Sequence, residues 1–452
     1  MQTRRVASAV GLALLLGACA SASARSPSSA APAAAAASSP DRAASAPPAQ
    51  PDAVPPANAA PASASPAQAA AGAPARPPSA GNTASAPAAP AAQSFGALVP
   101  ISLEVPAGHQ VAPFDQPRTL NLPAGFRAQL FAAGLTNPRM MIFDEHGVLH
   151  VTQTSDGSVV ALPDRDGDGV ADEVVAVHTG LNRPHGLAFR DGWLYVANTD
   201  SVVRLGGAAD GLARPRRESV VDGLPSGGGH FTRTLGFGPD GGMYVSIGSS
   251  CNVCRERDSR RAAIVRYEPD GSGERIYAKG LRNAVGFLWR PGTDELWATN
   301  NGRDNLGDDV PPETLNLVRD GDDFGWPRCH AGRIVDPDYG DAGACAGVAA
   351  PRAEMQAHGA PLGLAFYPGP SDVIVALHGS WNRSVPVPPQ LVHVLLSPDG
   401  HGEVEPFATG WQLGGSADSR WGRVAGVAVG PDGALYVSDD TAGAIYRLTA
   451  TR

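Results

Sequence analysis

The chain has 452 residues and a formal net charge of −9, so it is acidic overall. This charge is a poor fit for nucleic acid or an anionic lipid surface, and an anionic ligand would need a local cluster of cations. The C-terminal part, about 350 residues, shows strand patterns and no sustained helical period, which predicts a nearly all-β fold.

Residues 1–18 have the features of a secretory signal peptide. Arg4 and Arg5 precede an apolar stretch that is too short to span a membrane in the mature protein. The stretch ends in Leu-Gly-Ala-Cys, which resembles a bacterial lipobox and predicts lipid attachment at Cys19. We therefore expect a periplasmic protein whose lipid anchor is its one membrane contact, in the outer membrane because Ala20 follows the cysteine. An ordinary signal peptide is the alternative.

Residues 19–97 are expected to form a linker. The segment is almost entirely Ala, Ser and Pro. Such a composition cannot bury a hydrophobic core, so we expect a disordered and partly extended chain. It would tether the anchor to a globular domain over residues 98–452.

The globular part repeats one pattern six times: an apolar run, a turn with Gly, Asp or Pro, and a second apolar run. Each copy predicts a β-hairpin. The second runs begin at Leu149, Leu194, Met243, Leu296, Val373 and Leu435. Because strand patterns recurring every 40–50 residues or so are typical of propeller blades, we predict an all-β, six-bladed β-propeller.

The sequence contains five cysteines. If Cys19 is lipidated, export makes the other four candidates for disulfides, and four cysteines allow three pairings. Their separation along the chain favours the pairs Cys251–Cys254 and Cys329–Cys345. A zinc site, or a redox-active pair at Cys251 and Cys254, is the alternative.

Cationic, titratable or amide side chains precede the inner strand of every blade, where aliphatic residues would be the default. They are Arg139, His185, His230, Arg233, Arg282, Asn283, His358, Arg420 and Arg423. A propeller gathers these strand starts at one end of its channel. Because Arg binds carboxylates with paired hydrogen bonds, the set predicts an anion-binding site. Ordinary charge at exposed strand starts is the alternative.

Two acidic segments have features of calcium sites. Asp164, Asp166 and Asp168 alternate before Gly169 like the first half of an EF-hand loop, although the glutamate at its twelfth position is missing. A structural calcium site and a plain acidic turn are both possible there. Residues 300–316 combine carboxylates, amides and glycine, and can present oxygen atoms to a hard cation.

Six segments occur in a characteristic order along the chain. They are GGGHFTRTLGFGPDGGMYVSIGSSCNVC, GLRNAVGF, NNGRDNLGDDVPPE, FGWP, HGSWNRS and GRVAGVAVGPDGALYVSDD. From about Leu120 onward the chain thereby resembles the soluble quinoprotein sugar dehydrogenases, especially the L-sorbosone and pyranose dehydrogenase group. The resemblance implies a six-bladed propeller that binds pyrroloquinoline quinone (PQQ) and calcium at the top of its channel.

The resemblance also implies roles for individual residues. His230 is similar to the general base of the family, and histidine titrates in a suitable range for this role. Arg282 and Asn283 resemble the pair that contacts the quinone, where Arg282 would stabilise developing negative charge. His185 lies where the family places a side chain of the substrate cleft.

The remaining implied contacts concern calcium and the carboxylates of the cofactor. Gly302 and Arg303 resemble the two residues whose backbone carbonyls bind calcium, which would act as a Lewis acid. Arg383 and Arg423 resemble contacts to the cofactor carboxylates. We expect Arg233, at the same end of the channel, to bind the cofactor as well.

The prediction is therefore PQQ- and calcium-dependent oxidation of an aldose or related sugar by hydride transfer to the quinone. Its partners would be the sugar and an electron acceptor of unknown identity. A metal-dependent sugar lactonase with the same fold is one alternative; it would bind metal through carboxylates and Asn and need no arginine cluster. A non-catalytic propeller that binds a cell-envelope partner is another.

Overall fold

The structure is a computed structural model that describes residues 94–207 and 216–451. The chain divides into two compact units, and the second, Ala84–Arg452, contains all of the described residues. The expected signal peptide, Cys19 and most of the expected linker lie outside them. The one helix within these ranges is a three-residue 3-10 turn, η1 (Ala417–Ser419), so no helix found there could span a membrane.

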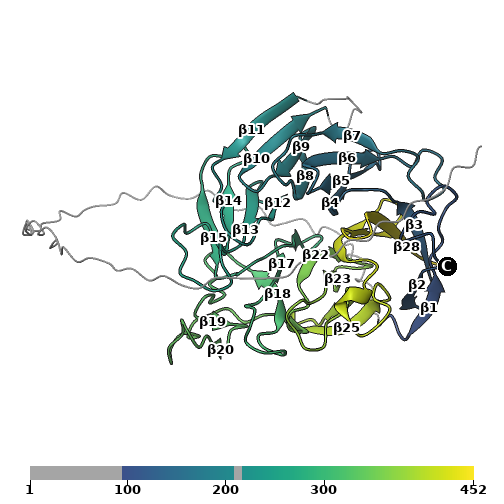
Figure 1. The fold of residues 1–452 in the computed structure, drawn as a ribbon. Coiled ribbons are helices and arrows are strands. Elements are labelled where there is room, and N and C mark those ends of the chain that lie inside the picture. Colours follow the sequence, from purple (N-terminus) through teal and green to yellow (C-terminus); the bar gives the residue numbers. More distant parts are fainter. Residues whose placement is uncertain (1–93, 208–215, 452) are drawn as a thin grey trace, which may run out of the picture. The chain divides into compact units, whose positions relative to one another are not determined.

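Six four-stranded antiparallel sheets follow one another around a ring, which confirms the six-bladed β-propeller (Figure 1). The inner strands of neighbouring blades contact each other around the ring. The inner strands are β4 (Pro138–Phe143), β8 (Gly186–Arg190), β12 (Arg233–Phe237), β16 (Phe287–Trp289), β22 (Pro361–Phe366) and β26 (Val424–Val429).

The second strands begin at the positions predicted from the repeat, or one residue before them. They are β5 (Leu149–Gln153), β9 (Trp193–Ala197), β13 (Met243–Ile247), β17 (Leu296–Asn300), β23 (Asp372–Leu377) and β27 (Leu435–Asp439). The third strands are β6 (Ser158–Leu162), β10 (Ser201–Gly206), β14 (Ala263–Tyr267), β18 (Glu313–Val318), β24 (Gln390–Leu396) and β28 (Ala444–Ala450).

The sixth blade is built from both ends of the domain. Its outer strand, β3, comes from the N-terminal side and pairs with β28, so that Phe126 lies opposite Ala450. The outer strands are β7 (Val175–His178), β11 (Arg216–Asp222), β15 (Arg275–Lys279), β21 (Ala353–Met355), β25 (Gly402–Ala408) and β3 (Phe126–Ala132). Two additional hairpins are β1 (Leu98–Ser102) with β2 (Thr119–Pro123), and β19 (Cys329–His330) with β20 (Ile334–Val335).

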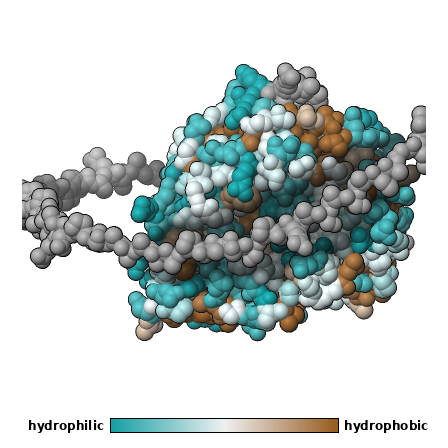
Figure 2. Space-filling view, in the orientation of Figure 1, coloured by the Kyte–Doolittle hydropathy of each residue, from teal (hydrophilic) through white to brown (hydrophobic). Residues whose placement is uncertain are grey.

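Apolar side chains pack between adjacent blades, while the described surface in Figure 2 is mostly hydrophilic with separated hydrophobic patches. Phe95 belongs to this packing, because its ring lies edge-to-face against Phe126 and Phe407, with ring centroids 6.0 and 4.9 Å away. The sequence-based boundary of the globular domain is residue 98, whereas the packed part of the described chain already includes Phe95. The residues just before Phe95 are rich in alanine, so the sequence gives no signal for this earlier start.

The two ends of the channel differ in character. Where the inner strands end, a cavity of about 530 Å³ is lined largely by apolar residues that include Phe143, Phe237 and Trp289. Deeper inside, Val285, Leu362 and Ala425 pack together with Met140. The polar residues at the strand starts therefore lie on the other side of an apolar layer.

Glycines in the inner strands allow neighbouring blades to approach closely. A Cβ atom at Gly426 would lie 2.3 Å from the Arg139 carbonyl oxygen, a separation that real Cβ atoms essentially never show. A Cβ atom at Gly286 would lie 2.2 Å from the Leu362 carbonyl oxygen. Because the obstructing atoms belong to the backbone, a methyl group could be accommodated only by moving the blades apart.

Replacing Gly426 with alanine should therefore destabilise the propeller. We expect a loss of about 1–3 kcal/mol in the free energy of unfolding, the usual cost of overpacking. Denaturant unfolding followed by circular dichroism would measure it. Gly415→Ala is the matched control, because a Cβ there meets no atom within 4 Å and its effect should be within about 0.5 kcal/mol. Equal stabilities of the two variants would contradict the packing argument.

Candidate functional site

The starts of the inner strands surround a cavity of about 130 Å³. Its walls come from the segments before β12, β16 and β22, and from the chain after β17 and β23. The lining residues are His230, Arg282, Asn283, Asn301, Gly302, Asp304, Glu313, His358, Ala360 and Trp381. Residues that the sequence singled out in three different blades therefore meet in one place.

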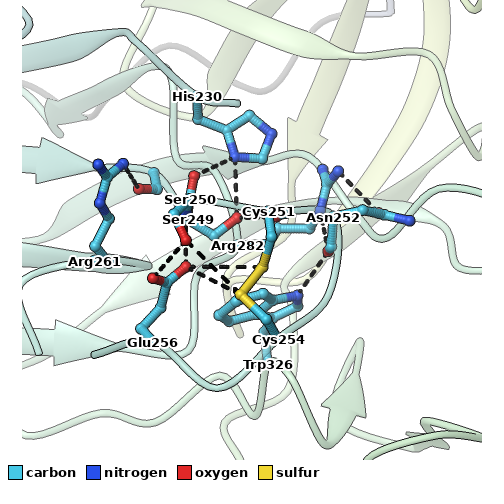
Figure 3. Close-up of a disulfide and its surroundings, with 11 residues drawn as sticks. His230, Ser249, Ser250, Cys251, Asn252, Cys254, Glu256, Arg261, Arg282 and Trp326 are labelled. Atoms are coloured by element: carbon cyan, nitrogen blue, oxygen red, sulfur yellow. Dashed lines mark hydrogen bonds between the residues drawn. A yellow bond between two sulfur atoms is a disulfide. The ribbon is translucent and has the colours of Figure 1, made fainter. Parts of the chain in front are cut away.

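His230 is held through one ring nitrogen and leaves the other free. Its Nδ1 lies 2.9 Å from the Ser249 carbonyl oxygen and 3.0 Å from Ser249 Oγ (Figure 3). A carbonyl can only accept, and Ser249 Oγ already donates to the Cys251 carbonyl oxygen at 2.6 Å. The Nδ1 atom must therefore carry the proton, which leaves a lone pair on Nε2.

The protonation state of His230 also suits a proton acceptor. Burial, followed by the charge of Arg282, lowers the pKa of His230 to about 3. The ring is therefore neutral near pH 7, and no described residue forms a hydrogen bond with its Nε2 atom. A neutral imidazole with a free nitrogen can accept a proton from a bound hydroxyl group, but a pKa of about 3 makes it a weaker base in the cofactor-free protein than the sequence suggested.

Arg282 lies beside His230 and is 5% exposed. Its Nη2 atom forms an ion pair with Asp304 Oδ2 at 2.7 Å, and its Nε atom donates to the Asn252 carbonyl at 2.9 Å. Burial lowers the pKa of this guanidinium, while Asp304 opposes that effect. Arg282 is thus a buried, oriented cation at the wall of the cavity.

Asn283 brings an unsatisfied acceptor to the same wall. Its side-chain oxygen Oδ1 is buried and has no hydrogen-bond partner within the described chain. Gly248 provides the necessary room, because a Cβ atom there would lie 2.4 Å from Asn283 Oδ1 and 2.7 Å from His230 Cβ. Buried acceptors are normally paired, so this atom is available for a donor group of a ligand.

The cavity also contains carboxylates that the sequence analysis did not single out. Glu313 is 3% exposed and accepts hydrogen bonds from the backbone amides of Gly302 and Ala360, at 2.6 and 3.0 Å. Burial raises the pKa of Glu313 to about 7. Asp304 accepts from Arg282 and from Asn382 Nδ2, the latter at 2.9 Å. Both lie in residues 300–316, but this segment has several carboxylates, and its sequence does not show which of them turn inward.

One of the two residues whose carbonyls are predicted to bind calcium, Gly302, lies at this cavity. In the part of the chain that the structure describes, neither the Gly302 nor the Arg303 carbonyl accepts a hydrogen bond. The Arg303 side chain points elsewhere and forms ion pairs with Asp336 and Asp338. Carbonyls without a hydrogen-bond donor are suitable ligands for a hard cation, and calcium binding by Gly302 and Arg303 stays a prediction.

Arg383 and Arg423 are not among the residues that line the cavity. Arg383 forms an ion pair with Asp309 at 3.0 Å and donates to the Asp308 carbonyl. Arg423 donates to the carbonyls of His378 and Gly379, at 3.1 and 3.3 Å. The structure thus gives both guanidinium groups partners within the protein, and their contact with a cofactor stays a prediction.

Arg233 and His185 lie deeper than the sequence suggested. Arg233 has no exposed surface, and its guanidinium donates to the carbonyls of Pro225, His230 and Thr232. It therefore supports the loop that carries His230 instead of lining the cavity. His185 is also fully buried, with Nδ1 3.2 Å from Thr234 Oγ1. His185 does not line the cavity, and its role in substrate binding stays a prediction.

Several arginines at this end of the channel lack carboxylate partners. Arg233, Arg261 and Arg423 donate to backbone carbonyls, and within the described ranges none of them forms an ion pair. Arg139 differs, because it pairs with Asp440 at 2.5 Å. Three arginines of an acidic protein are therefore held near this site without a direct carboxylate partner.

Both predicted disulfides, Cys251–Cys254 and Cys329–Cys345, are confirmed. At the acidic turn, ligand oxygens of Asp164, Asp166 and Asp168 lie within 4.8 Å of one another. Backbone amides of the same turn already bind these carboxylates, for example that of Gly167 to Asp164 at 2.9 Å. Calcium binding there stays a prediction.

Comparison with known proteins identifies relatives over most of the described part. The chain is 26% identical over 353 residues to an uncharacterised protein of Borreliella burgdorferi, covering 73% of this chain and 90% of the relative. It is 28% identical over 403 residues to a pyrroloquinoline quinone-dependent pyranose dehydrogenase of Coprinopsis cinerea. That match covers 73% of this chain and 55% of the relative, so the chain spans about half of the fungal enzyme's length.

Solved structures share the fold. The calcium structure of a Trichoderma reesei carbohydrate-active enzyme of family AA12 superimposes with a TM-score of 0.66 at 22% identity, covering 73% of this chain and 96% of that structure. The holo form of the PQQ domain of Coprinopsis cinerea pyranose dehydrogenase gives 0.65 at 23% identity, covering 77% and 98%. The TrAA12-like family model matches residues 120–338 and 334–451. The resemblance to quinoprotein sugar dehydrogenases is thereby confirmed, and the chain belongs to the TrAA12-like family.

Proposed function

We propose that this protein oxidises an aldose or a related sugar with PQQ and calcium. The observation that carries the proposal is the arrangement of His230 and Arg282, a neutral base and a buried cation on the wall of one cavity. The names of relatives such as the Coprinopsis cinerea pyranose dehydrogenase support it.

The residues at the site fit PQQ. This cofactor carries three carboxylates, and the arginines without carboxylate partners, Arg233 and Arg261 among them, make this end of the channel favourable for an anion. The unpartnered Asn283 Oδ1 can accept a hydrogen bond from a donor on the ligand. Arg282 can donate to a ligand oxygen at the edge of the cavity.

The residues also fit calcium. The free carbonyls of Gly302 and Arg303 and the carboxylate of Glu313 are hard oxygen donors, which calcium prefers. A divalent cation would offset the cost of a charged carboxylate at Glu313, which is buried beside another carboxylate, Asp304.

When bound, PQQ would supply the two-electron oxidation, and calcium would polarise it as a Lewis acid. His230 would remove the proton of the sugar hydroxyl at Nε2, while Ser249 keeps the ring in the required tautomer through Nδ1. Arg282 would stabilise negative charge that develops at the edge of the cavity.

Trp381 is a candidate for sugar binding. It lines the cavity, yet 72% of its surface is exposed, which is unusual for so large an aromatic side chain. Aromatic rings are frequent in small-molecule sites because they provide flat apolar contact area.

The main test is reconstitution with PQQ and calcium, followed by dye-linked sugar oxidation. We expect activity that requires both additions and is lost on chelation. His230→Ala should keep PQQ binding but lose about 100- to 10,000-fold in kcat, the range typical for a general base. Lactone hydrolysis with a metal alone would favour the lactonase. Binding of an envelope component with neither activity would favour a non-catalytic propeller.

The lowered pKa of His230 gives a separate prediction about pH. In the cofactor-free protein the ring should stay neutral until the pH approaches about 3, whereas an unfolded histidine titrates near 6.5. As the pH falls, the unfolded chain therefore binds a proton at His230 before the folded chain does. The stability that the neutral ring of His230 contributes is present above pH 6.5 and is lost as the pH falls toward 3. Nuclear magnetic resonance of the ring nitrogens would measure the titration, and a midpoint near 6.5 would contradict it.

Replacing Trp381 should affect sugar binding more than chemistry. In the loaded enzyme, Trp381→Ala should raise KM for the sugar about 10-fold with little change in kcat, which is the signature of lost uniform binding. Leu413→Ala is the control, because Leu413 is 71% exposed and does not line the cavity. An unchanged KM in Trp381→Ala would remove this residue from the sugar site.

A further inference from the structure

The loop closed by the Cys251–Cys254 disulfide lies next to Arg282 and Ser249, and Ser249 holds His230 (Figure 3). It follows β13, and only Asn252 and Val253 lie between the two cysteines. None of these four residues lines the cavity. The loop nevertheless contacts Arg282 directly and His230 through Ser249, the two residues to which the proposed function assigns the chemistry.

Asn252 binds Arg282 at two points. Its backbone oxygen accepts from Arg282 Nε at 2.9 Å, and its side-chain Oδ1 accepts from Nη2 at 3.0 Å. The other acceptors of this guanidinium are Asp304 Oδ2 at 2.7 Å and the Asn301 carbonyl at 3.4 Å. Because a guanidinium is planar, two contacts from one residue fix its orientation as well as its place.

Asn252 is itself held on several sides. Its Nδ2 donates to the Asp304 carbonyl at 3.0 Å, and its Oδ1 accepts from the Asp304 amide at 2.8 Å. The Trp326 indole donates to the Asn252 carbonyl at 3.2 Å. A side-chain amide is required for this set, because alanine offers neither group and a carboxylate could not donate to Asp304.

The disulfide and its neighbours keep the loop in the shape that presents Asn252. Glu256 accepts from the Ser250 amide at 2.6 Å and from Ser250 Oγ at 2.8 Å. Ser249 Oγ donates to the Cys251 carbonyl, while the Ser249 carbonyl holds His230. Cross-linking two residues this close in sequence limits the conformations of the residues between them.

We propose that the disulfide loop is a clamp for Arg282, and that Asn252 is a positioning residue for the oxidation. Asn252 does not line the cavity, so it acts through the residues that it binds, Arg282 and Asp304, and the effect proposed here is the one on the orientation of the guanidinium. The proposal rests on the proposed function, in which Arg282 acts on the bound cofactor.

The first test compares Asn252→Ala with a buried asparagine elsewhere. In enzyme loaded with PQQ and calcium, Asn252→Ala should lower kcat by roughly 10- to 100-fold, the scale expected for a misplaced catalytic group. Asn316→Ala is the control, because Asn316 is 2% exposed and its side chain also binds a backbone carbonyl, that of Ala298. The control should show a comparable fall in melting temperature but retain kcat.

The second test observes Arg282 without turnover. In cofactor-free protein, the Arg282 Nε–H resonance, assigned by its loss in Arg282→Lys, should exchange slowly with water. We expect exchange at least 10-fold faster in Asn252→Ala and in the double variant Cys251→Ser/Cys254→Ser. Unchanged exchange in both variants would overturn the clamp, and Asn252→Ala alone decides the question if the double variant does not fold.

A double-mutant comparison separates the clamp from the proposed function. If Arg282→Ala retains full activity, the role assigned to Arg282 in the proposed function is wrong, and the clamp has no reaction to support. If Arg282→Ala loses activity while Asn252→Ala keeps it, the clamp is wrong and the proposed function stands. If the proposed function and the clamp are both correct, each single variant loses activity. Adding Asn252→Ala to Arg282→Ala should then cause no further loss in kcat, because the two residues act as one unit.

Discussion

The pairing of β3 with β28 is the constraint on which the rest of the structure depends. His230, Arg282, Gly302 and His358 come from segments spread over more than a hundred residues, and each is carried by the start or end of a blade strand. These residues belong to three neighbouring blades, and the closed ring holds those blades against one another. The last blade lacks an outer strand until the N-terminal β3 joins it, so one strand pairing secures the geometry of a distant site.

Inside that ring, the site depends on arginines that bind carbonyls. Carboxylate partners would neutralise their charge, whereas carbonyls orient them and leave the charge available to a ligand. Arg233 and Arg261 donate to backbone carbonyls in and near the loop before β12. Arg282 also donates to a backbone carbonyl, in addition to its carboxylate partner Asp304. The overall acidity of the chain therefore says little about the local potential at the channel.

The strands and the general place of the site could be predicted from the sequence, because alternation and turn residues are local signals. The same alignment of strand starts brought His230, Arg282 and Asn283 together correctly. It could not show that Arg233 and His185 turn into the protein, since that depends on the carbonyls of Pro225 and Thr232 and on the hydroxyl of Thr234. Glu313 was hidden for a similar reason: its backbone donors, Gly302 and Ala360, are distant from it in sequence.

The register of the closing blade has a consequence for the connectivity of the chain. Phe126 at the start of β3 lies opposite Ala450 at the end of β28, so the chain enters and leaves the ring at one corner of one blade. A short peptide could join these two points, and new ends could then be opened in a turn between other strands. The ring of blades would keep its strand pairings wherever the chain is opened, so the domain is suited to circular permutation and to insertion into a larger protein.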